Sequence, residues 1–494
     1  MIIVSVTGPT TRRALDQIAE SSRFADLFEL RLDLISHPDM ARLIRAATKP
    51  CIATCRPVWE GGEFRGPEKK RIEILKEAAV KGACYVDLEL EAGAAAADEF
   101  LRLENRPKVI ISRHLSSSRG INVPHVYAAL HATRAEIIKF AFPATDSHQI
   151  RHVIDFLERA RTDRRKAIAI AMGEYGQASR VLYRKLGGWA TYAAPEDGRA
   201  AASGQIPASE LKGLYRADRL TGRTRVFGVV GNPLGQSKGV YIHNALMKLA
   251  SQDAVYCKFP VCNLAAFMRY VAPVLSGCSV TIPYKEKILK YLDEADSVAR
   301  GIGAVNTVVR RGRRLKGTNT DAAGALDAIE RVMKVRGKRI LIMGAGGAAR
   351  AIAYESLRRG ASVLIANRTA LRARKLVREL HTRALDSNVR YAAVGDLTGN
   401  EFEILVNATS VGMIPHVHLS PVPKVLLTEK VVLDAVYNPP VTQLLKDAVR
   451  AGAQTISGKE MYLNQAALQF ELYTGKVPDR RLMRRILTRM LASH

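Results

Sequence analysis

The sequence has few cysteines, few aromatic residues and no long apolar run. Six cysteines in 494 residues are too few for a disulfide framework, and none forms a Cys-x-x-Cys pair. No histidine cluster shows metal-ligand spacing, and no apolar run approaches the roughly 18–20 residues that cross a membrane. The N-terminus lacks the basic flank and apolar core of a signal peptide. We therefore expect reduced thiols, no metal, no membrane partner and a cytoplasmic location.

The composition is otherwise that of a globular protein with an excess of positive charge. Hydrophobic residues make up 47% and charged residues 25%, which excludes wholesale disorder. The length predicts roughly two to four domains. Lysine and arginine number 75 against 47 aspartate and glutamate residues, a net charge of +28. Such a charge indicates anionic partners and says nothing about the fold.

A nucleic-acid-binding protein is one class that this charge allows. Aromatic residues are only 6%, however, and no helix-turn-helix, zinc or RNA-binding signature is present. The arginine-rich segment 480–489 is better explained as one face of a terminal helix. We therefore expect small anionic substrates and no nucleic-acid partner, while the oligomeric state stays open.

Up to about residue 205, short β-rich runs alternate with amphipathic stretches such as 67–81 and 146–161. The expected strands are 2–7, 27–32, 50–54, 85–90, 108–112, 137–142 and 167–172. Repeated strand–helix units predict an α/β fold with a parallel sheet. Roughly eight such units would close a barrel with active residues at the C-terminal strand ends; an open doubly wound sheet is the alternative.

Charged residues interrupt or follow several of these strands. Lys139 lies inside the apolar strand 137–142, where burial lowers the pKa of an amine. A neutral lysine amine can attack a ketone and form a Schiff base, although Lys139 alone could also be a strand-end lysine that reaches solvent. His114, taken alone, is more often a histidine with satisfied hydrogen bonds. The arginines at strand ends could be surface charges, or could together bind a carboxylate substrate.

These residues lie in motifs that resemble those of the type I 3-dehydroquinate dehydratases. In family order, the motifs are E-L-R-L-D at 29–33, T-C-R-x-x-x-E-G-G at 54–62, D-L-E-L at 87–90, S-R-H at 112–114, I-K-F-A at 138–141, M-G-x-x-G-x-x-S-R at 172–180 and G-Q at 204–205. The resemblance covers nearly all of residues 1–208 and implies a (β/α)8 barrel.

The resemblance also implies a metal-free dehydration. Lys139 would be the Schiff-base lysine, and His114 would remove the C2 proton and assist loss of the C1 hydroxyl of 3-dehydroquinate. Glu60 would orient or tune His114. The implied substrate-binding residues are Glu29, Arg31, Arg56, Arg180 and Gln205. One departure is Ala201, where the family has a lid-loop serine. We expect this departure to affect lid closure or substrate affinity rather than the Schiff-base chemistry.

Residues 209–224 are expected to form a linker with one short helix at 209–214, and a new strand opens at 226–230. Later, the strand 339–343 runs into a glycine-rich turn at 344–350, which is followed by a helix that reaches residue 357. Backbone N–H groups of such a turn can hold a pyrophosphate.

The next strand, 361–366, ends in Asn367-Arg368-Thr369, with Arg372 close behind. An acidic residue there would bind the ribose of NAD, whereas arginines suit the 2′-phosphate of NADP. Two surface arginines at a helix start are the alternative.

Three polar segments precede this unit. Lys285 ends the strand that begins at 279, Asn306 lies in a loop at 303–307, and Asp321 lies just ahead of a helix. Singly, Lys285 could be a solvated charge and Asp321 a helix N-cap.

The order of these segments resembles the shikimate dehydrogenases. The motifs are G-N-P-L-G-x-S at 231–237, I-H-N at 242–244, V-T-I-P-x-K-E at 280–286, A-V-N-T at 304–307, N-T-D at 319–321, the glycine-rich turn, N-R-T at 367–369, N-A-T-S-V-G-M at 407–413, D-x-V-Y-N-P at 434–439 and M-Y-L-N-Q at 461–465. The resemblance covers about 225–494. It implies a substrate lobe at 225–325, completed by about 466–494, and a Rossmann-type NADP lobe at 326–465, with the active site in the cleft.

In that family's terms, Lys285 and Asp321 would be the catalytic pair that handles the proton on the substrate oxygen. Substrate would contact Ser237, Thr281, Asn306 and Gln465. NADP would contact Gly344, Gly346, Gly347, Asn367, Arg368, Thr369 and Arg372, with Met413 and Tyr437 near the nicotinamide or the cleft.

Departures from the dehydrogenase pattern cluster at one turn. The family's H-S-x-S-P reads Gln236-Ser237-Lys238-Gly239-Val240, so Gly239 replaces the second serine, and Ser279 replaces the asparagine of N-V-T-I-P. We hypothesise that Lys238 compensates as a cation for the substrate carboxylate.

The order of the two halves resembles the fused enzymes of plants and some bacteria, which convert 3-dehydroquinate to 3-dehydroshikimate and then, with NADPH, to shikimate. One alternative is an active dehydratase with a second half of quinate-type specificity or low activity. Another is a dehydratase beside a binding or regulatory second half.

Overall fold

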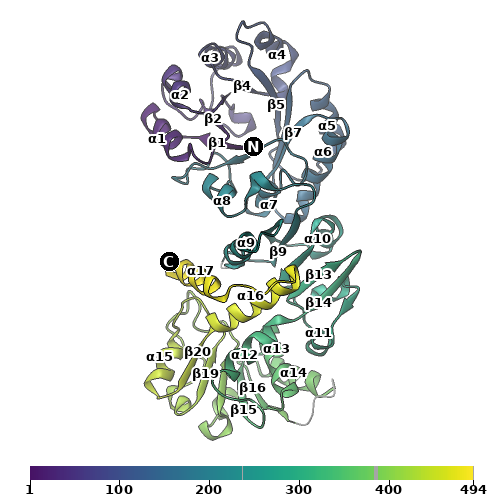
Figure 1. Cartoon of the computed structure of the whole chain (residues 1–494), viewed down its shortest axis with the longest axis vertical. Helices are drawn as coiled ribbons and strands as arrows, with labels where there is room; N and C mark the ends of the chain where they lie inside the picture. The colour runs from purple at the N-terminus through teal and green to yellow at the C-terminus, as the bar shows by residue number, and fades with distance from the viewer. Residues whose placement is uncertain (236, 383–387, 493–494) are drawn as a thin grey trace. The chain divides into compact units, whose positions relative to one another are not determined.

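The computed structural model describes residues 1–235, 237–382 and 388–492, and its contacts divide the chain into two compact units. The first comprises Met1–Val226 together with Asp253–Val274, and the second comprises Phe227–Gln252 together with the chain from Leu275 onward. Each unit alternates strands and helices (Figure 1). In the part of the chain that the structure describes, no helix has the length and apolar character needed to cross a bilayer.

The first unit is built on an eight-stranded parallel sheet. Its strands are β1 (Ile2–Val6), β2 (Leu27–Arg31), β3 (Cys51–Thr54), β4 (Tyr85–Glu89), β5 (Lys108–His114), β6 (Ile137–Pro143), β7 (Lys166–Met172) and β8 (Thr191–Ala193). They lie in the order β7-β6-β5-β4-β3-β2-β1-β8. Just before β8, the Trp189 N–H donates to the Ala167 carbonyl of β7 at 2.8 Å, so the sheet nearly closes into the predicted barrel.

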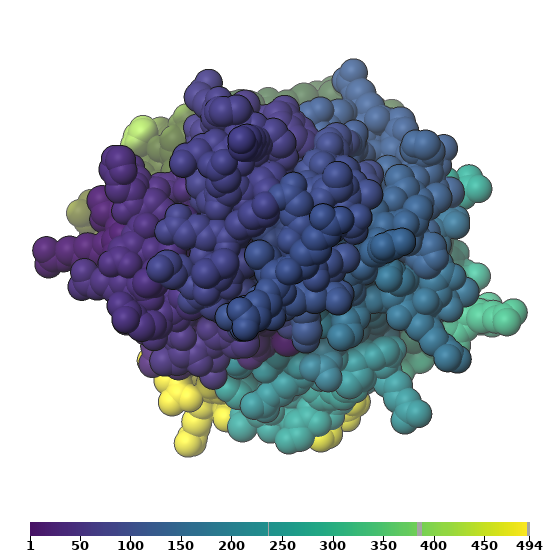
Figure 2. Space-filling model, turned by 90° about the horizontal axis from the view of Figure 1, so that it is seen from above, coloured from purple at the N-terminus to yellow at the C-terminus, as the bar shows by residue number. Residues whose placement is uncertain are grey.

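Helices connect these strands and cover the outside of the sheet. They are α1 (Thr11–Ser21), α2 (Met40–Ala46), α3 (Glu68–Val80), α4 (Gly93–Leu101), α5 (Val123–His131), α6 (Ile150–Thr162), α7 (Gln177–Val181) and α8 (Ala208–Gly213). Helix α6 shows why they pack there, because Val153, Phe156, Leu157 and Ala160 repeat every three or four residues and are buried. Figure 2 shows the closely packed atoms of the N-terminal half, purple to blue, on the face that it presents.

The seven strands predicted for this half are confirmed, and α8 confirms the short helix predicted at 209–214. The eighth strand was not predicted. β8 has only three residues, Thr191–Ala193, which is too short for a readable alternation of apolar and polar residues.

Two layers of side chains fill the barrel. The N-terminal layer is an apolar cluster that includes Ile3, Leu27, Ile52, Ile110, Ile137 and Ile168. Side chains two residues apart on a strand share a face, so the next inward layer holds Ser5, Glu29, Thr54, Ser112 and Lys139, all of them buried. The alternation therefore places polar chemistry at the C-terminal side of an apolar floor.

The first unit also includes a segment that comes after β9 in the chain. The segment carries β10 (Ala254–Pro260) and α10 (Leu264–Tyr270). Asp146, in the loop after β6, accepts hydrogen bonds from the backbone N–H groups of Cys262 at 3.1 Å and Asn263 at 2.6 Å. The Thr224 hydroxyl donates to Asp253 at 2.6 Å. The chain therefore leaves the first unit and returns to it once.

The second unit begins with a mixed sheet. Within this unit the order is β9 (Arg225–Gly231), β11 (Gly277–Val280), β13 (Thr307–Arg311), β14 (Arg314–Thr318) and β12 (Glu294–Ala295). Helices α9 (Gly239–Leu249) and α11 (Ser297–Ile302) belong to this part. β13 is antiparallel to both β11 and β14.

A parallel sheet follows in the order β17-β16-β15-β18-β19-β20. Its strands are β15 (Arg339–Met343), β16 (Ser362–Ala366), β17 (Val389–Tyr391), β18 (Ile404–Asn407), β19 (Val431–Asp434) and β20 (Gln454–Ser457). The helices are α12 (Thr320–Glu330), α13 (Gly347–Arg358), α14 (Ala370–Thr382), α15 (Gln443–Arg450), α16 (Gly458–Thr474) and α17 (Arg480–Ala492). Apolar clusters cover both faces. The strand order reverses beside β15, where doubly wound sheets bind ligands.

Candidate active sites

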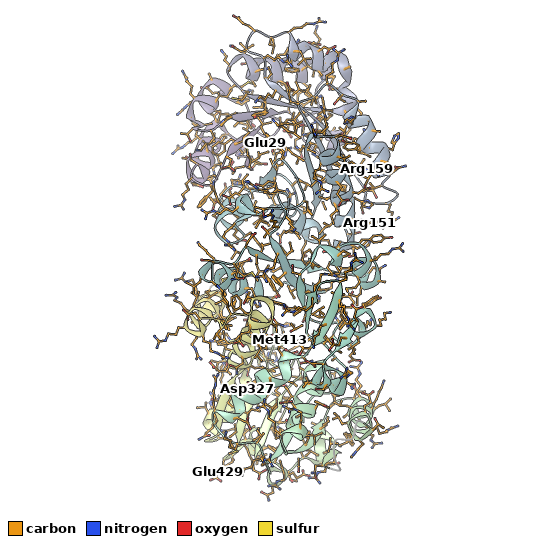
Figure 3. All side chains as sticks on the ribbon, turned by 45° about the vertical axis from the view of Figure 1, so that its right-hand side comes forward. Glu29, Arg151, Arg159, Asp327, Met413 and Glu429 are labelled. Carbon is orange, nitrogen blue, oxygen red and sulfur yellow. The ribbon has the colours of Figure 1, made fainter. Side chains whose placement is uncertain are left out.

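Lys139 is buried inside the barrel, with 4% of its surface exposed. Its Nζ donates to Asp87 Oδ2 at 2.8 Å and lies 4.0 Å from Glu29 Oε1. It also lies 4.1 Å from the centroid of the Tyr192 ring. Glu29 is labelled in Figure 3, within the first unit. The alternative of a strand-end lysine that reaches solvent is therefore wrong.

Arg56 is surrounded by carboxylates. Its guanidinium lies 2.6 Å from Glu89 Oε1, 2.8 Å from Asp87 Oδ1 and 3.5 Å from Glu60 Oε2. Burial opposes the charge of Arg56, but these carboxylates outweigh it and raise the Arg56 pKa. Burial likewise opposes the charge of Asp87, but Arg56 and Lys139 hold the pKa of Asp87 well below its ordinary value. Asp87 therefore stays ionised as the partner of Lys139.

His114 and Glu60 form a second pair in the same polar layer. His114 Nδ1 lies 2.9 Å from Glu60 Oε2. Burial, together with the charges of Arg56 and Lys139, lowers the pKa of His114 well below its ordinary value. Burial raises the pKa of Glu60 to about 7, against the opposing charge of Arg56. A neutral histidine next to a carboxyl that titrates near neutrality suits proton transfer.

Arg180 differs from the other arginines of the barrel because no carboxylate of a described residue pairs with it. It is 1% exposed and donates to the backbone carbonyls of Tyr192 at 3.3 Å and Ser203 at 3.4 Å. Its buried Nε has no hydrogen-bond partner among the described residues. Burial lowers the pKa of Arg180 to about 10. Of the described residues, only the charge of Glu29 opposes this lowering, and a buried cation without a paired carboxylate is a strong candidate for binding an anionic group.

The other predicted substrate residues are held by protein contacts. Glu29 accepts from Ser5 Oγ at 2.7 Å and Thr54 Oγ1 at 3.0 Å. Arg31 pairs with Asp33 through two hydrogen bonds, of 2.9 and 2.7 Å.

Gln205 links the loop before it to β1. Its Oε1 accepts from the backbone N–H of Ala201 at 2.8 Å, and its Nε2 donates to Ser5 Oγ at 3.2 Å. The position that departs from the family is therefore tied to Gln205 through its main chain, which a serine and an alanine share.

Sequence reasoning gave no role to Asp87, Glu89 or Tyr192, although Asp87 is the closest partner of Lys139. A signal was present. Asp87 and Glu89 alternate with apolar residues in Tyr85–Glu89, and this spacing places both carboxylates on the inner face of the barrel.

Lys285 and Asp321 meet in the second unit. Lys285 Nζ donates to Asp321 Oδ2 at 2.5 Å, and the two side chains are 19% and 11% exposed. Two local predictions were wrong. β11 ends at Val280, so Lys285 lies in the turn that follows. The helix N-cap is Asn319, whose side chain accepts from the Asp321 N–H at 3.1 Å, so Asp321 lies inside the first turn of α12.

Backbone and amide contacts fix this pair in place. The Val305 N–H donates to the Lys285 carbonyl at 2.7 Å. Asn306 Oδ1 accepts from the Thr320 N–H at 2.8 Å, and its Nδ2 donates to Thr320 Oγ1 at 2.9 Å. Asn306 is 2% exposed. Its observed contacts hold the loop that carries Lys285 against the start of α12.

The remaining predicted substrate residues are half-buried. They are Ser237, Thr281 and Gln465. Gln465 lies on α16, which packs so closely on α12 that a β-carbon built on Gly324 would lie 3.0 Å from that of Gln465. Lys238 is 5% exposed and Gly239 begins α9. Gln236, the first residue of the departing turn, lies outside the described residues.

Ser279, the second departure from the dehydrogenase pattern, is buried. Its Oγ lies 2.8 Å from Gln469 Oε1, to which it donates, and 2.9 Å from the Tyr473 hydroxyl. Both partners are on α16, so the residue that replaces the family's asparagine joins a hydrogen-bond network with that helix.

The glycine-rich turn lies beside the Lys285–Asp321 pair. Gly344 has φ +119°, and a β-carbon there would lie 3.0 Å from the Ala408 carbonyl oxygen. A β-carbon on Gly346 would meet nothing within 4 Å, and one on Gly347 would lie 3.6 Å from Lys285 Cδ. The turn therefore leaves open space at the N-terminus of α13, as a pyrophosphate requires.

The end of β16 presents cations and no acidic residue. Arg368, Thr369 and Arg372 are exposed, and Asn367 donates to the Thr369 carbonyl at 3.0 Å. No carboxylate among the described residues pairs with Arg368 or Arg372. This arrangement fits the 2′-phosphate of NADP. Residues 367–372 include no acidic residue of the kind that binds the ribose of NAD.

The loops after β18 and β19 lie at the same edge of this sheet as the glycine-rich turn, because β15, β18 and β19 are parallel. Met413, labelled in Figure 3, is 37% exposed. The Tyr437 ring centroid lies 4.7 Å from that of Tyr462. Burial raises the pKa of Tyr437 to about 12. Asp434 accepts from Asn407 at 2.9 Å and joins the two loops; sequence reasoning assigned it no role.

Family models match the chain in four consecutive stretches. They are type I 3-dehydroquinase at residues 2–221, shikimate dehydrogenase substrate binding domain at 229–308, shikimate/quinate 5-dehydrogenase at 327–418 and shikimate 5′-dehydrogenase C-terminal domain at 458–488.

Curated relatives and solved structures agree with these matches. A bifunctional 3-dehydroquinate dehydratase/shikimate dehydrogenase of Arabidopsis thaliana, described as chloroplastic, is 35% identical over 98% of this chain and 84% of the relative. A shikimate dehydrogenase (NADP(+)) of Pyrococcus abyssi is 40% identical over 53% of this chain and 97% of its own length. A crystal structure of a shikimate dehydrogenase in complex with NADP+ has a TM-score of 0.52 and 36% identity, covering 55% of this chain and 97% of that chain.

Proposed function

Because the chain belongs to the bifunctional 3-dehydroquinate dehydratase/shikimate dehydrogenases, we propose that it uses the two sites described above for these two reactions. The first unit dehydrates 3-dehydroquinate to 3-dehydroshikimate at Lys139 and His114. The second reduces 3-dehydroshikimate to shikimate with NADPH at Lys285 and Asp321. The observation that carries the proposal is a buried lysine that shares the barrel with Arg180, a buried arginine without a carboxylate partner.

In the first unit, the Lys139 amine attacks the substrate ketone, and loss of water leaves an iminium. His114 takes the C2 proton, and the electron pair of the broken C–H bond moves into the iminium, which acts as the electron sink. His114 then returns the proton to the C1 hydroxyl, which departs as water. Hydrolysis of the iminium releases the enone and restores Lys139.

Glu60 controls which nitrogen of His114 can accept that proton. An ionised Glu60 accepts from Nδ1–H and leaves Nε2 free to act as the base. A protonated Glu60 donates to Nδ1 and places the histidine proton on Nε2. Because the pKa of Glu60 is about 7, the dehydratase should gain activity as the pH rises through neutrality.

Arg180 is the candidate for the substrate carboxylate. An incoming carboxylate would compensate its buried charge and give its free Nε a partner. Arg31 and Arg56, by contrast, already have carboxylate partners within the protein. We therefore expect loss of Arg180 to affect substrate binding more than loss of Arg31 does.

In the second unit, the residues present fit NADP. Gly346 leaves room at the N-terminus of α13, Gly344 has the φ of +119° that this turn requires, and a β-carbon on Gly347 would make only an ordinary contact with Lys285. Arg368 and Arg372 suit the 2′-phosphate. NADPH supplies the hydride when bound. Lys285 and Asp321 hold the proton that the substrate oxygen gains, and their 2.5 Å hydrogen bond keeps it beside the glycine-rich turn.

The location of the protein in the cell is also a proposal. All six cysteines are free thiols, which supports a reducing compartment such as the cytoplasm.

The test supplies 3-dehydroquinate to the purified full-length chain, with and without NADPH. Enone absorbance, NADPH oxidation and product identity are followed together. We expect enone in both mixtures, and shikimate with NADPH loss only where NADPH is added. Enone without NADPH loss would remove the proposed second reaction, and absence of both signals would remove the whole proposal.

Matched variants assign each reaction to its site. Lys139→Gln is expected to abolish enone formation and leave reduction of supplied 3-dehydroshikimate intact. Borohydride added with 3-dehydroquinate should attach the substrate covalently at Lys139 in the parent and at no residue in Lys139→Gln. Quinate with NAD+ or NADP+ tests the alternative specificity, which none of the relatives described above favours, and rapid oxidation of quinate would revive it.

A further inference from the structure

Arg71 is a fully buried arginine on a helix outside the barrel. It lies on α3 and has 0% of its surface exposed. Its Nε and NH2 donate to Glu68 at 2.9 and 2.6 Å, and its NH1 donates to the Cys55 carbonyl at 3.1 Å. NH1 also lies 2.5 Å from Glu89 Oε2. Burying a charge is costly unless it is paired, so this side chain needs an explanation beyond the packing of α3.

Glu89 connects Arg71 to the dehydratase site. It lies at the end of β4 with 0% exposure, and its other oxygen accepts from Arg56 NH1 at 2.6 Å. Arg71 and Arg56 therefore hold one carboxylate from two sides. Burial raises the pKa of Glu89, and the two arginines oppose that rise.

Arg56 carries the line of charges to the two reacting side chains. It pairs with Asp87 at 2.8 Å, which binds Lys139, and with Glu60 at 3.5 Å, which binds His114. The contact with Glu60 is the longest of those Arg56 makes with carboxylates, so it is the first to weaken if Arg56 moves toward Glu89. Arg71 opposes that movement because its positive charge, 2.5 Å from Glu89 Oε2, attracts the same carboxylate from the other side.

We propose that Arg71 is a positioning residue of the dehydratase, which acts through Glu89 and Arg56 on the carboxylates that hold Lys139 and His114. It touches no reacting atom. The inference rests on the proposed dehydratase activity of the first unit. It adds that the geometry of the site is set partly from outside the barrel, by a side chain on α3.

A purely structural role for Arg71 makes different predictions. Its bonds to Glu68 and to the Cys55 carbonyl tie α3 to the end of β3, and loss of that tie would lower stability without changing proton transfer. The pH dependence of the dehydratase separates the two roles, because it reports on Glu60 and His114.

The experiment replaces Arg71 by methionine in the full-length chain. We expect dehydratase kcat to fall about 10- to 100-fold, as small misplacements of catalytic groups do, with KM changed less than about threefold. Glu89 then draws Arg56 away from Glu60, and the pKa of Glu60 rises because a neighbouring positive charge is lost. The rise of dehydratase activity near pH 7 should therefore move to a pH that is higher by about half a unit or more. Reduction of supplied 3-dehydroshikimate by the same chain should be unchanged.

Two variants complete the design. Glu68→Gln removes the second carboxylate that pairs with Arg71. The Glu68 side chain is 47% exposed, so its loss should leave kcat and the pH profile at parent values. Arg71→Lys keeps the charge, but its ammonium cannot reach Glu68, Glu89 and the Cys55 carbonyl together. It should fall between the parent and Arg71→Met in both kcat and pH profile.

The inference is overturned if the rise of activity in folded Arg71→Met stays at the parent pH or moves to a lower pH. It is also overturned if Glu68→Gln loses as much kcat as Arg71→Met. If Arg71→Met does not fold, Arg71→Lys decides: an upward shift supports the inference and a parent profile overturns it. Failure of the proposed function is distinct, because the parent itself would then make no enone.

Discussion

The two sites differ in how far their charges are connected. In the first unit, Lys139 lies in a buried network that runs through Asp87, Arg56 and Glu89 to Arg71. In the second, Lys285 has one carboxylate partner among the described residues, Asp321, and both side chains keep some exposure. A buried network couples distant charges strongly because little water screens them. The comparison teaches that substitutions in the barrel should spread, whereas those in the dehydrogenase site should act locally.

The largest local effect is expected for Asp321→Asn. The substitution removes the carboxylate that holds Lys285 Nζ at 2.5 Å, so kcat for reduction of 3-dehydroshikimate should fall about 10²- to 10⁴-fold. NADPH oxidation measures this loss. Enone formation from 3-dehydroquinate by the same preparation should match the parent. A fall in both activities would break the comparison, because the effect would not be local.

The next effect tests spreading within the barrel. Glu60→Gln keeps a group that can bond to His114 but removes the titration near pH 7. We expect dehydratase kcat to fall about 10²-fold and the rise of activity through neutrality to flatten. The sign follows from the mechanism, since only the ionised carboxylate leaves Nε2 free to accept a proton. A pH–rate profile decides, and an unchanged limb would assign it to another group.

A smaller effect is expected where the second unit meets its cofactor. Arg368→Ala and Arg372→Ala remove exposed cations at the end of β16. Each should raise KM for NADPH about tenfold, which corresponds to about 1.4 kcal/mol, and leave KM for NADH unchanged. Steady-state kinetics with both cofactors make the comparison. Equal changes for NADPH and NADH would remove the 2′-phosphate role.

The smallest effect is expected at the turn that departs from the family. Lys238→Ala and Gly239→Ser should change KM for 3-dehydroshikimate about two- to fivefold, in opposite directions, if Lys238 replaces the missing serine at the substrate carboxylate. Thr281→Ala, at another predicted substrate contact, serves as a positive control. An unchanged KM in both variants would count against a carboxylate role for this turn.

Most of the fold could be predicted because its strands alternate with amphipathic helices or lead into a glycine-rich turn. The strand before Gly344 and the strand that contains Lys139 are examples, and the structure places both where the pattern indicates. β8 was not predicted because three residues are too few to show an alternation of apolar and polar side chains. Asp321 was placed ahead of the helix, whereas it is the second residue of α12. Asn319, which is an equally good cap, precedes it by two residues and is the N-cap.

The residues of the sites were predictable, whereas their partners were less so. Arg56 and Arg180 look alike in sequence, yet one is shared by three carboxylates and the other has none among the described residues. That difference depends on which strands are neighbours and on which side chains share the barrel interior. Long-range pairing of this kind, such as Arg71 with Glu89, leaves no local pattern to read.

The return of residues Asp253–Val274 to the first unit has a consequence for how such a chain could be divided. A single cut in the linker, at any bond between residues 214 and 224, would leave β10 and α10 on the other fragment. The Asp146 carboxylate would then lose the backbone N–H groups of Cys262 and Asn263. Residues 229–308 match the shikimate dehydrogenase substrate binding domain, so β10 and α10 would stay with the dehydrogenase fragment, and the N-terminal fragment would lose two hydrogen bonds that Asp146 accepts in the intact chain.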